Sequence, residues 1–301
     1  MTDTIYYKVL KKNLNHFGFQ YNLGLNIDIE EFNPSSSCES GGLYFTNKEN
    51  ITNYLDYGVY IAELTVPNDA QVYEDPYNCK WKADKLIINK YYPINEWDGW
   101  NDENTRLLTI KNGGHKLKFI PKKFKTKELC ELAVEYYGLA LKFVPEEFKT
   151  KEFCLIAVKQ NGLALKFVPE EFKTKELCEL AIKNKGYALR YVPEDLKSKE
   201  LCLLAIEYYG SALKFVPEEF KTYELCLLTI KDYGRAVQFV PKEFKTKELY
   251  ELAVKNDVWA LEFVSEKIIN KELCELAVEN YGYALKFVPE KLKTKELCEL
   301  A

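Results

Sequence analysis

Apolar residues in the second part of the chain recur with the spacing of an amphipathic helix. In the segment KELCELAVEYY, which begins at Lys127, the apolar positions lie on one arc of roughly 200° at about 100° per residue. They are Leu129, Cys130, Leu132, Ala133, Val134 and Tyr137. One neighbouring helix cannot cover so wide an arc. The pattern therefore predicts a helix at 127–137 that is packed on two sides.

The same segment returns with a period of 24 residues. Cysteine keeps this period at 130, 154, 178, 202, 226, 274 and 298, and proline keeps it at 121, 145, 169, 193, 217, 241 and 289. Glycine keeps it at 114, 138, 162, 186, 210, 234 and 282. The exceptions Tyr250, Val258 and Ser265 fall in one repeat. A strict period of this length predicts units that bury their apolar faces against one another.

Each repeat contains signals for two helices. A helix-capping residue opens it, as Thr126 does, and a carboxylate follows near the positive end of the helix dipole. Gly138 stands where a left-handed helix stop is expected. Residues 139–144 then predict a shorter helix that ends before Pro145, because the residue preceding proline avoids the α region. The repeats therefore predict an all-α solenoid of two-helix units.

The first hundred residues lack the period. IYYKVL, GLYFT, GVYIAELTV and KLIINKYY have the composition of strands, and ENITNYLDYG predicts one short helix. We expect an α+β domain at 1–95, a linker with a capping repeat at 96–125, and an α-solenoid at 126–301 with seven full repeats and a partial eighth. Trp97 and Trp100 are expected to pack the joint in preference to binding a ligand.

Charge and hydropathy exclude two classes of partner. The chain of 301 residues has 42 Lys and Arg against 46 Asp and Glu, so its bulk charge is not that of a nucleic-acid-binding protein. No apolar run approaches the length that spans a membrane, and the absence of a signal-peptide pattern predicts a cytosolic location. One local exception could form a basic patch, although a solvated face is the favoured interpretation: Lys116, Lys118, Lys122, Lys123, Lys125 and Lys127.

The periodic cysteines are expected to be small buried apolar residues. Equivalent atoms in successive repeats should lie about 8–10 Å apart, beyond the reach of a disulfide. Their separation also differs from the short spacing of zinc ligands. No metal or cofactor is predicted, and many free thiols favour a reducing compartment. Cys38 and Cys79 could pair only if the fold brings them together.

Positions that vary between repeats are candidates for partner binding, because a solenoid presents them on a repeated scaffold. The residue after the glycine and the pair at the helix end vary most, and aromatic residues and Arg are frequent interface anchors. The predicted partner-binding residues are Tyr187, Tyr208, Tyr209, Tyr233, Arg235, Trp259 and Tyr283. The alternative is that these rings only cover the groove between helices. Trp259 is the strongest candidate, because its repeat has also lost the glycine, proline and cysteine.

Two segments carry a resemblance to known proteins. SCESGGLYFTNKENITNYLDYGVYIAELTVPNDAQV, with KWKADKLII, resembles the domain that precedes ankyrin arrays in mimivirus-type giant viruses. The 24-residue repeats resemble a family of unknown function found in protists, bacteria and the same viruses. Together these resemblances cover nearly the whole chain. They imply a viral protein made in host cytoplasm and no settled activity.

The segments GGLYFT and GVYIAELTVP also resemble ADP-ribosyltransferase-like folds. That resemblance implies that Tyr44 stacks on nicotinamide. However, Lys8 stands where such folds have a histidine, and no catalytic glutamate can be placed. His16 is expected to be a surface or packing residue. A catalytically inactive relative is the favoured interpretation of this resemblance.

These observations favour a non-enzymatic scaffold or adaptor that binds another protein in the cytoplasm. No catalytic residue is predicted, and neither nucleic acid nor a membrane is an expected partner. The first alternative is an ADP-ribosyltransferase-like enzyme or its inactive relative. The second is a structural virion protein or a self-assembling one. It is suggested by the last repeat, TKELCELA, which ends at Ala301 without a successor.

Overall fold

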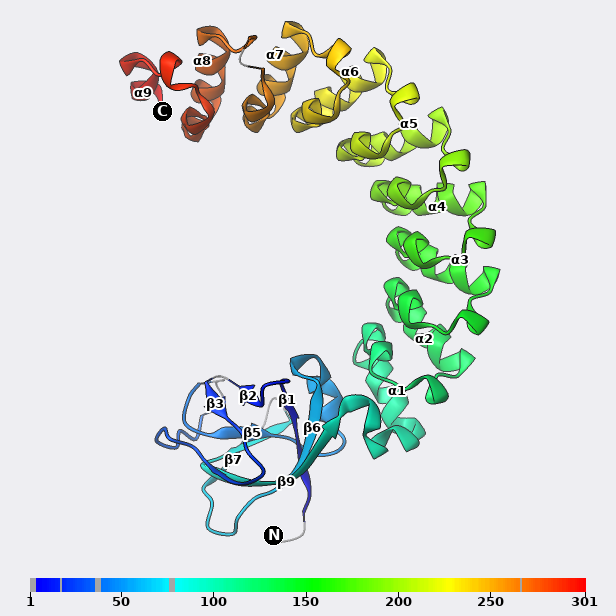
Figure 1. Cartoon of the computed structure of the whole chain (residues 1–301), viewed down its shortest axis with the longest axis vertical. Helices are drawn as coiled ribbons and strands as arrows, with labels where there is room; N and C mark the ends of the chain where they lie inside the picture. The colour runs from blue at the N-terminus through cyan, green and yellow to red at the C-terminus, as the bar shows by residue number, and fades with distance from the viewer. Residues whose placement is uncertain (1–3, 17, 36–38, 76–78, 266) are drawn as a thin grey trace. The chain divides into compact units, whose positions relative to one another are not determined.

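The chain forms two compact units. The computed structural model describes residues 4–16, 18–35, 39–75, 79–265 and 267–301. The first unit is Met1–Phe148 and the second is Lys149–Ala301 (Figure 1). The strand-rich region and two helical repeats belong to the first unit, and the later repeats form the second. The boundaries 1–95, 96–125 and 126–301 stay a prediction.

The strand-rich region contains antiparallel strands in three small sheets. The strands are β1 (Tyr6–Leu10), β2 (Asn15–His16), β3 (Phe19–Gln20), β4 (Gly24–Ile27), β5 (Leu43–Phe45), β6 (Tyr60–Thr65), β7 (Val72–Asp75), β8 (Lys80–Ala83) and β9 (Lys85–Pro93). Their orders are β1-β6-β9-β4, β5-β8-β7 and β2-β3. An isolated bridge between Tyr7 and Thr46 links β1 to the end of β5. This bridge brings the edges of the two larger sheets together.

A strand-rich beginning of the chain is confirmed. The four segments expected to be strands contain β1, β5, β6 and β9. The expected short helix is a 3₁₀-helix, Ile51–Tyr57. Strands β2, β3, β4, β7 and β8 were not predicted. A core that includes Leu10, Leu43, Leu64 and Ile88 holds the sheets together.

The two joint tryptophans are buried, as predicted. Trp97 and Trp100 are 2% and 0% exposed, and their ring centroids lie 5.3 Å apart. The Trp100 indole N–H donates to the carbonyl oxygen of Ile94 at 2.6 Å. Their rings therefore fill the joint.

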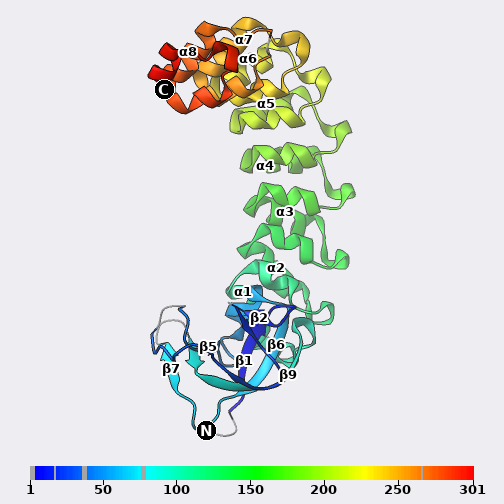
Figure 2. The ribbon, with the colours of Figure 1, turned by 60° about the vertical axis from the view of Figure 1, so that its left-hand side comes forward.

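Each repeat contains one α-helix. The α-helices are α1 (Glu103–Lys111), α2 (Lys127–Tyr136), α3 (Lys151–Gln160), α4 (Lys175–Asn184), α5 (Lys199–Tyr208), α6 (Tyr223–Asp232), α7 (Lys247–Asn256), α8 (Lys271–Asn280) and α9 (Lys295–Leu300). The second helix of a repeat is a 3₁₀-helix, such as Gly186–Tyr191. In the second unit, each α-helix from α3 onward packs on the next one (Figure 2). A solenoid of two-helix repeats is confirmed there.

The predicted caps at the helix starts are confirmed, but the predicted helix stop is wrong. The Thr126 hydroxyl accepts the backbone N–H of Leu129 at 3.2 Å. At the other end, helix α2 stops at Tyr136, and Tyr137 is extended with φ −154°. Gly138 begins the next 3₁₀-helix instead of adopting a left-handed conformation. Tyr137 is 36% exposed, so it lies outside the buried arc.

The periodic glycine serves close packing between repeats. A Cβ atom on Gly186 would lie 2.6 Å from the carbonyl oxygen of Ala205 in the following repeat. Added Cβ atoms on Gly162 and Gly234 would likewise meet the carbonyl oxygens of Ala181 and Ala253. Glycine is therefore needed because two backbones approach closely.

Two repeats depart from this glycine–alanine pair. Thr229 replaces the alanine that faces Gly210, and Val258 replaces the glycine that faces α8. At both places the α-helix packs less closely on the preceding 3₁₀-helix. The added side-chain volume explains the looser packing, since a methyl group cannot enter a gap that only glycine fits.

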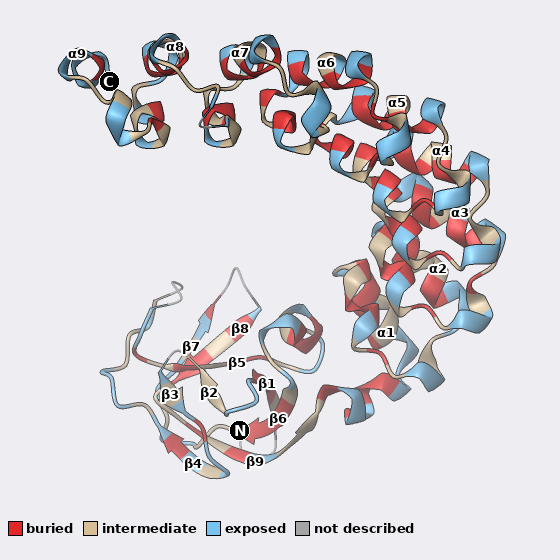
Figure 3. Ribbon diagram, turned by 45° about the horizontal axis from the view of Figure 1, so that its top comes forward, coloured by how far each residue is buried: buried red, intermediate tan, exposed pale blue. Residues whose placement is uncertain are grey.

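Buried residues recur in every repeat of the second unit (Figure 3). Cys154, Cys178, Cys202 and Cys226 are fully buried, which confirms their predicted role. Burial raises the pKa of the Cys202 thiol to about 11. Cys79 is exposed, and so is the periodic Cys298, for which the predicted burial is wrong. Cys38 lies outside the described residues.

Within the residues that the structure describes, no helix is long and apolar enough to cross a membrane. Among the same residues, no group of three or more His, Cys, Asp or Glu is placed to hold a metal ion.

Candidate functional site

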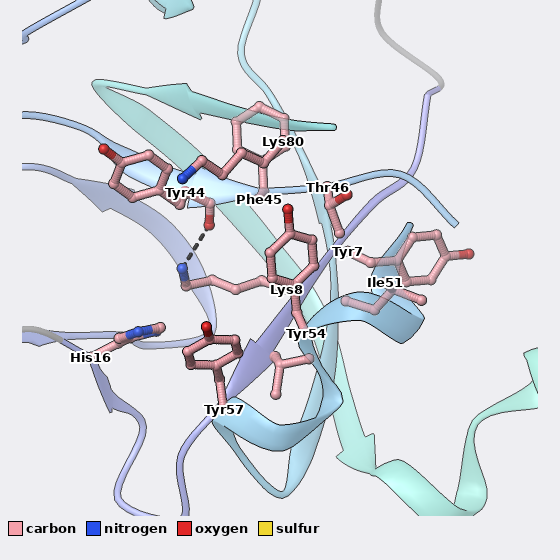
Figure 4. A pocket seen from close by; sticks show the side chains of 11 residues that line it. Tyr7, Lys8, His16, Tyr44, Phe45, Thr46, Ile51, Tyr54, Tyr57 and Lys80 are labelled. Atoms are coloured by element: carbon pink, nitrogen blue, oxygen red, sulfur yellow. Dashed lines mark hydrogen bonds between the residues drawn. The ribbon is translucent and has the colours of Figure 1, made fainter. Parts of the chain in front are cut away.

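A small cavity opens beside Tyr44 in the strand-rich region. It has a volume of about 60 Å³, and its lining is mostly aromatic and apolar. Lys8 on β1 and His16 on β2 face it from one side, and Tyr44 on β5 faces it from the other (Figure 4). The cavity thus joins residues from three strands that are far apart in the sequence.

Lys8 is an unusual residue for this position. Its side chain is buried, and burial lowers the pKa of its amine to about 7. The Lys8 Nζ atom donates to the backbone carbonyl oxygen of Tyr44 at 2.6 Å (Figure 4). This bond places lysine directly beside the tyrosine, where the transferase-like resemblance implies a histidine.

The ring of Tyr44 already contacts two other cations. The Nζ atoms of Lys80 and Lys82 lie 4.8 Å and 5.4 Å from its centroid. A positively charged nicotinamide would meet ammonium groups of its own sign at this ring. The structure thus brings Tyr44 and Lys8 together, but it supplies no direct support for cofactor stacking, and the transferase-like alternative stays a prediction.

His16 lines the same cavity as a half-buried side chain. Its pKa is lowered to about 4, first by burial and then by the nearby charges of Lys8 and Lys11. The imidazole is therefore neutral at physiological pH. This placement agrees with the predicted packing role.

Four of the six lysines that could have formed a basic patch near the joint have intramolecular partners, and the favoured solvated face is wrong for buried Lys116. Lys116 is buried and donates to the carbonyl oxygen of Thr52 at 2.7 Å. Lys125 donates to the carbonyl oxygen of Phe143 at 2.8 Å. Lys118 pairs with Asp56, and Lys122 pairs with Glu147. These lysines are held by intramolecular partners, which charge counting along the sequence cannot show.

The predicted partner-binding residues lie in the second unit, and several of them contact neighbouring repeats. Tyr187 lies with its ring centroid 4.4 Å from that of Tyr209, and its hydroxyl accepts the Ser211 hydroxyl at 2.8 Å. Tyr208 and Tyr209 are 57% and 48% exposed. The rings therefore cover the groove between repeats and still present area to solvent.

Arg235 and Trp259 are brought together from successive repeats. The Arg235 guanidinium forms an ion pair with Asp257 at 2.9 Å and lies 5.2 Å from the Trp259 ring centroid. The Asp257 carboxylate also accepts the backbone N–H of Trp259 at 3.0 Å. These contacts hold both side chains in fixed positions.

Trp259 is the centre of a larger aromatic cluster. The ring centroids of Tyr281, Tyr283 and Phe287 lie 6.0, 5.6 and 5.3 Å from its own. Lys286 Nζ lies 4.9 Å from the Trp259 centroid. Tyr281 and Tyr283 are 50% and 58% exposed. We call Arg235, Trp259, Tyr281, Tyr283 and Lys286 the tryptophan cluster.

The sequence prediction missed two members of the tryptophan cluster. Tyr281 is the variable residue at a helix end, and Lys286 precedes a periodic aromatic residue. Comparison of the repeats position by position could have found both. Tyr233, which was predicted, is 36% exposed and outside the cluster as defined.

Comparison with known proteins connects the chain to giant-virus proteins. It is 33% identical over 105 residues to "Putative ankyrin repeat protein R868" of Acanthamoeba polyphaga mimivirus, covering 33% of this chain and 52% of that protein. It is 34% identical over 104 residues to "Uncharacterized protein R869" of the same virus, covering 33% and 75%. "Putative ankyrin repeat protein R896" of this virus is 27% identical over 133 residues, covering 43% and 40%. The chain thus spans about half of R868 and less of R896.

The 24-residue repeats match a protein family, and their expected resemblance to a family of unknown function is confirmed. No solved structure matches the chain. The family match consists of overlapping windows, each of two repeats, at 102–149, 126–173, 150–197, 174–221, 198–245, 222–269 and 246–293. Because these windows cover well over half of its residues, the chain belongs to the family described as domain of unknown function (DUF4116).

Proposed function

We propose that this chain is a non-enzymatic scaffold that binds another protein in the cytoplasm of an infected host cell. The observation that carries the proposal is the tryptophan cluster, in which the half-exposed rings of Tyr281 and Tyr283 pack on the partly buried Trp259. Rigid aromatic residues lose little conformational entropy when a partner covers them. Similarity to mimivirus proteins that are named putative ankyrin repeat proteins also supports a protein-binding scaffold.

The proposed contact surface extends over several repeats. The tryptophan cluster is its anchor, and Tyr187, Tyr208, Tyr209 and Tyr233 extend it toward the earlier repeats. Trp, Tyr and Arg are the residue types whose truncation costs most in protein interfaces, commonly about 2 kcal/mol or more. We therefore place the largest binding contributions at Trp259 and Arg235.

The test is capture of partners by the full chain from a lysate of infected amoebae, with chemical crosslinking and mass spectrometry. The variant carries Trp259→Ala and Arg235→Ala. The control is Tyr223→Ala, because Tyr223 is an exposed ring at the start of α6, outside the proposed surface. The proposal predicts a partner that crosslinks near Trp259 and is lost from the variant but kept by the control.

Two measurements keep the result interpretable. Circular dichroism and urea unfolding must show that the variant is folded, since Trp259 also contacts the next repeat. If the folded variant captures the same proteins as the natural chain, the proposed surface is wrong. Sedimentation at several protein concentrations tests self-assembly, and concentration-dependent oligomers without any captured partner would favour that alternative.

A further inference from the structure

A row of cations runs along three consecutive repeats of the second unit. Lys166, Arg190 and Lys214 occupy the same position in their repeats, near the end of each 3₁₀-helix. All three side chains are exposed. The glutamates that follow them, Glu170, Glu194 and Glu218, pair instead with Lys173, Lys197 and Lys221. We call these three residues the cation row.

Aromatic rings alternate with the charges of the cation row. Lys166 Nζ lies 5.6 Å from the Phe167 ring centroid and 5.9 Å from that of Tyr191. The guanidinium carbon of Arg190 lies 5.7 Å from the same Tyr191 centroid. Such contacts stabilise an exposed cation over the face of a ring. The rings therefore restrict where the charges point.

The alternation continues into the next repeat. Arg190 lies 5.8 Å from the Phe215 ring centroid, and Lys214 Nζ lies 4.7 Å from the same centroid. Lys214 Nζ also lies 5.3 Å from the ring of Tyr187, which belongs to the proposed contact surface. The cation row and that surface are therefore continuous.

We propose that the cation row binds an acidic, extended segment of a partner protein with a carboxylate at every third residue. This inference rests on the proposed function and names the chemistry of the partner. The exposed cations can pair with negative groups at matching positions. Aromatic rings between them offer apolar faces, to which proline-rich extended chains commonly bind.

The spacing of the cations supports a carboxylate at every third residue of the bound segment. Lys166 and Arg190 contact the same ring, at 5.9 Å and 5.7 Å. They therefore lie at most roughly 12 Å apart, and packed helices of successive repeats lie about 8–10 Å apart. A polyproline II chain rises about 3.1 Å per residue with three residues per turn, so every third side chain returns to one face after about 9 Å. A carboxylate at each third residue would thus meet one cation per repeat.

The charges favour a polypeptide over a nucleic acid. Each strand of a nucleic-acid duplex has a phosphate about every 3.4 Å along the helix axis. Its charge density is therefore higher than that of the cation row, which has one charge per repeat. Glu170 and Glu194, which follow the row, each pair with a lysine three residues later, so they add little free negative charge beside it. The chain as a whole also has a net charge of −4.

The test measures binding of labelled peptides to the full chain by fluorescence anisotropy. The probe is (Glu-Pro-Pro)4, and a peptide of the same composition with its four glutamates clustered tests the spacing. We expect the spaced peptide to bind at least about tenfold more tightly, and binding should weaken as salt rises. Equal binding of the two peptides would overturn the inference. If a twelve-nucleotide oligothymidylate binds more tightly than the spaced peptide, the inference is also overturned and nucleic acid is the favoured partner.

Charge reversal locates the site. The triple variant Lys166→Glu, Arg190→Glu, Lys214→Glu should bind the spaced peptide at least about tenfold more weakly than the natural chain does. The control reverses three exposed lysines at the α-helix starts of the same repeats, with equal change in net charge: Lys151→Glu, Lys175→Glu and Lys199→Glu. This control should keep binding within about twofold if circular dichroism shows both variants folded.

The result separates this inference from the proposed function. If the folded row variant binds the spaced peptide as well as the natural chain does, the cation row is not the site. If no peptide binds but partner capture still depends on Trp259, the proposed acidic segment is refuted and the proposed function is kept. Peptide binding that depends on the row, without any partner lost on truncation of Trp259, would refute the proposed anchor and keep the row.

Discussion

Replacement of Gly186 by alanine tests the close packing of repeats directly. Gly186 begins the 3₁₀-helix Gly186–Tyr191 and faces the end of α5. The added Cβ would lie 2.6 Å from the carbonyl oxygen of Ala205 and 2.9 Å from the Cβ of Tyr209. That carbonyl also accepts the Tyr209 N–H at 2.9 Å, so it cannot turn away without breaking this bond. The two repeats must therefore separate.

The magnitude follows from two opposing effects. An extra methyl group in a closely packed site costs about 1–3 kcal/mol, because neighbouring contacts are stretched. Gly186 is not among the glycines with positive φ, so alanine fits the backbone and restricts the unfolded chain, which stabilises by about 0.4–1 kcal/mol. We expect a net loss of about 1–2 kcal/mol in the free energy of unfolding.

The assay is thermal and urea unfolding followed by circular dichroism at the helix band. A loss of this size lowers Tm by about 2–8 °C in a unit of roughly 150 residues. The matched control is Lys185→Ala, one residue earlier and exposed, which should stay within about 0.5 kcal/mol. If Gly186→Ala is as stable as the natural chain while the control is neutral, steric contact is not the reason for the periodic glycine.

Other predictions follow from burial and caps. The free energy of unfolding of the natural chain should increase between about pH 7 and 10, and Lys8→Met should make this increase smaller. In the natural chain the folded amine has a pKa of about 7 and the unfolded one keeps its ordinary value near 10.4, so the unfolded state binds more protons in this range. Urea unfolding at pH 7 and 9.5 measures the difference, and an unchanged slope would contradict the burial of the charge. Iodoacetamide at pH 8 should modify Cys79 and Cys298 in the folded chain and leave Cys202 unmodified, because that thiol is fully buried with a pKa of about 11. Peptide mass spectrometry reads the sites, and rapid native labelling of Cys202 would be inconsistent with its burial. Thr222→Ala should lower the free energy of unfolding by about 1 kcal/mol through loss of the cap of α6, as thermal unfolding would show, whereas full stability would mean that water replaces the cap.

The strand-rich region shows where prediction from the sequence reached its limit. Strands β2 and β3 have two residues each, which is too short for a hydrophobic alternation to be recognised. β8 contains Lys80 and Lys82, and alternating lysines do not indicate a buried strand. Both side chains are nevertheless buried, with their amines at the ring of Tyr44. Such burial depends on partners from other strands, which are distant in the sequence.

The candidate site divides in the same way. Trp259, Arg235 and Tyr283 could be selected because aromatic and arginine residues stand at positions that vary among repeats. Their ring contacts could not, since each joins residues about one period apart and depends on how closely two repeats approach. Lys286 was missed because only aromatic and arginine residues were selected, although its position also varies, with Gln238 and Glu262 in the two preceding repeats.

Local patterns were enough to reveal the period, the helix caps and the burial of the periodic cysteines before Cys298, because these depend on residues within one repeat and on its apolar arc. The reason for the periodic glycine required coordinates, since the carbonyl oxygen that excludes a side chain belongs to the following repeat. The cation row likewise emerges only when successive repeats stack, because stacking places each charge beside rings of two repeats. Contacts within a repeat are local in the sequence, whereas contacts between repeats depend on packing distance.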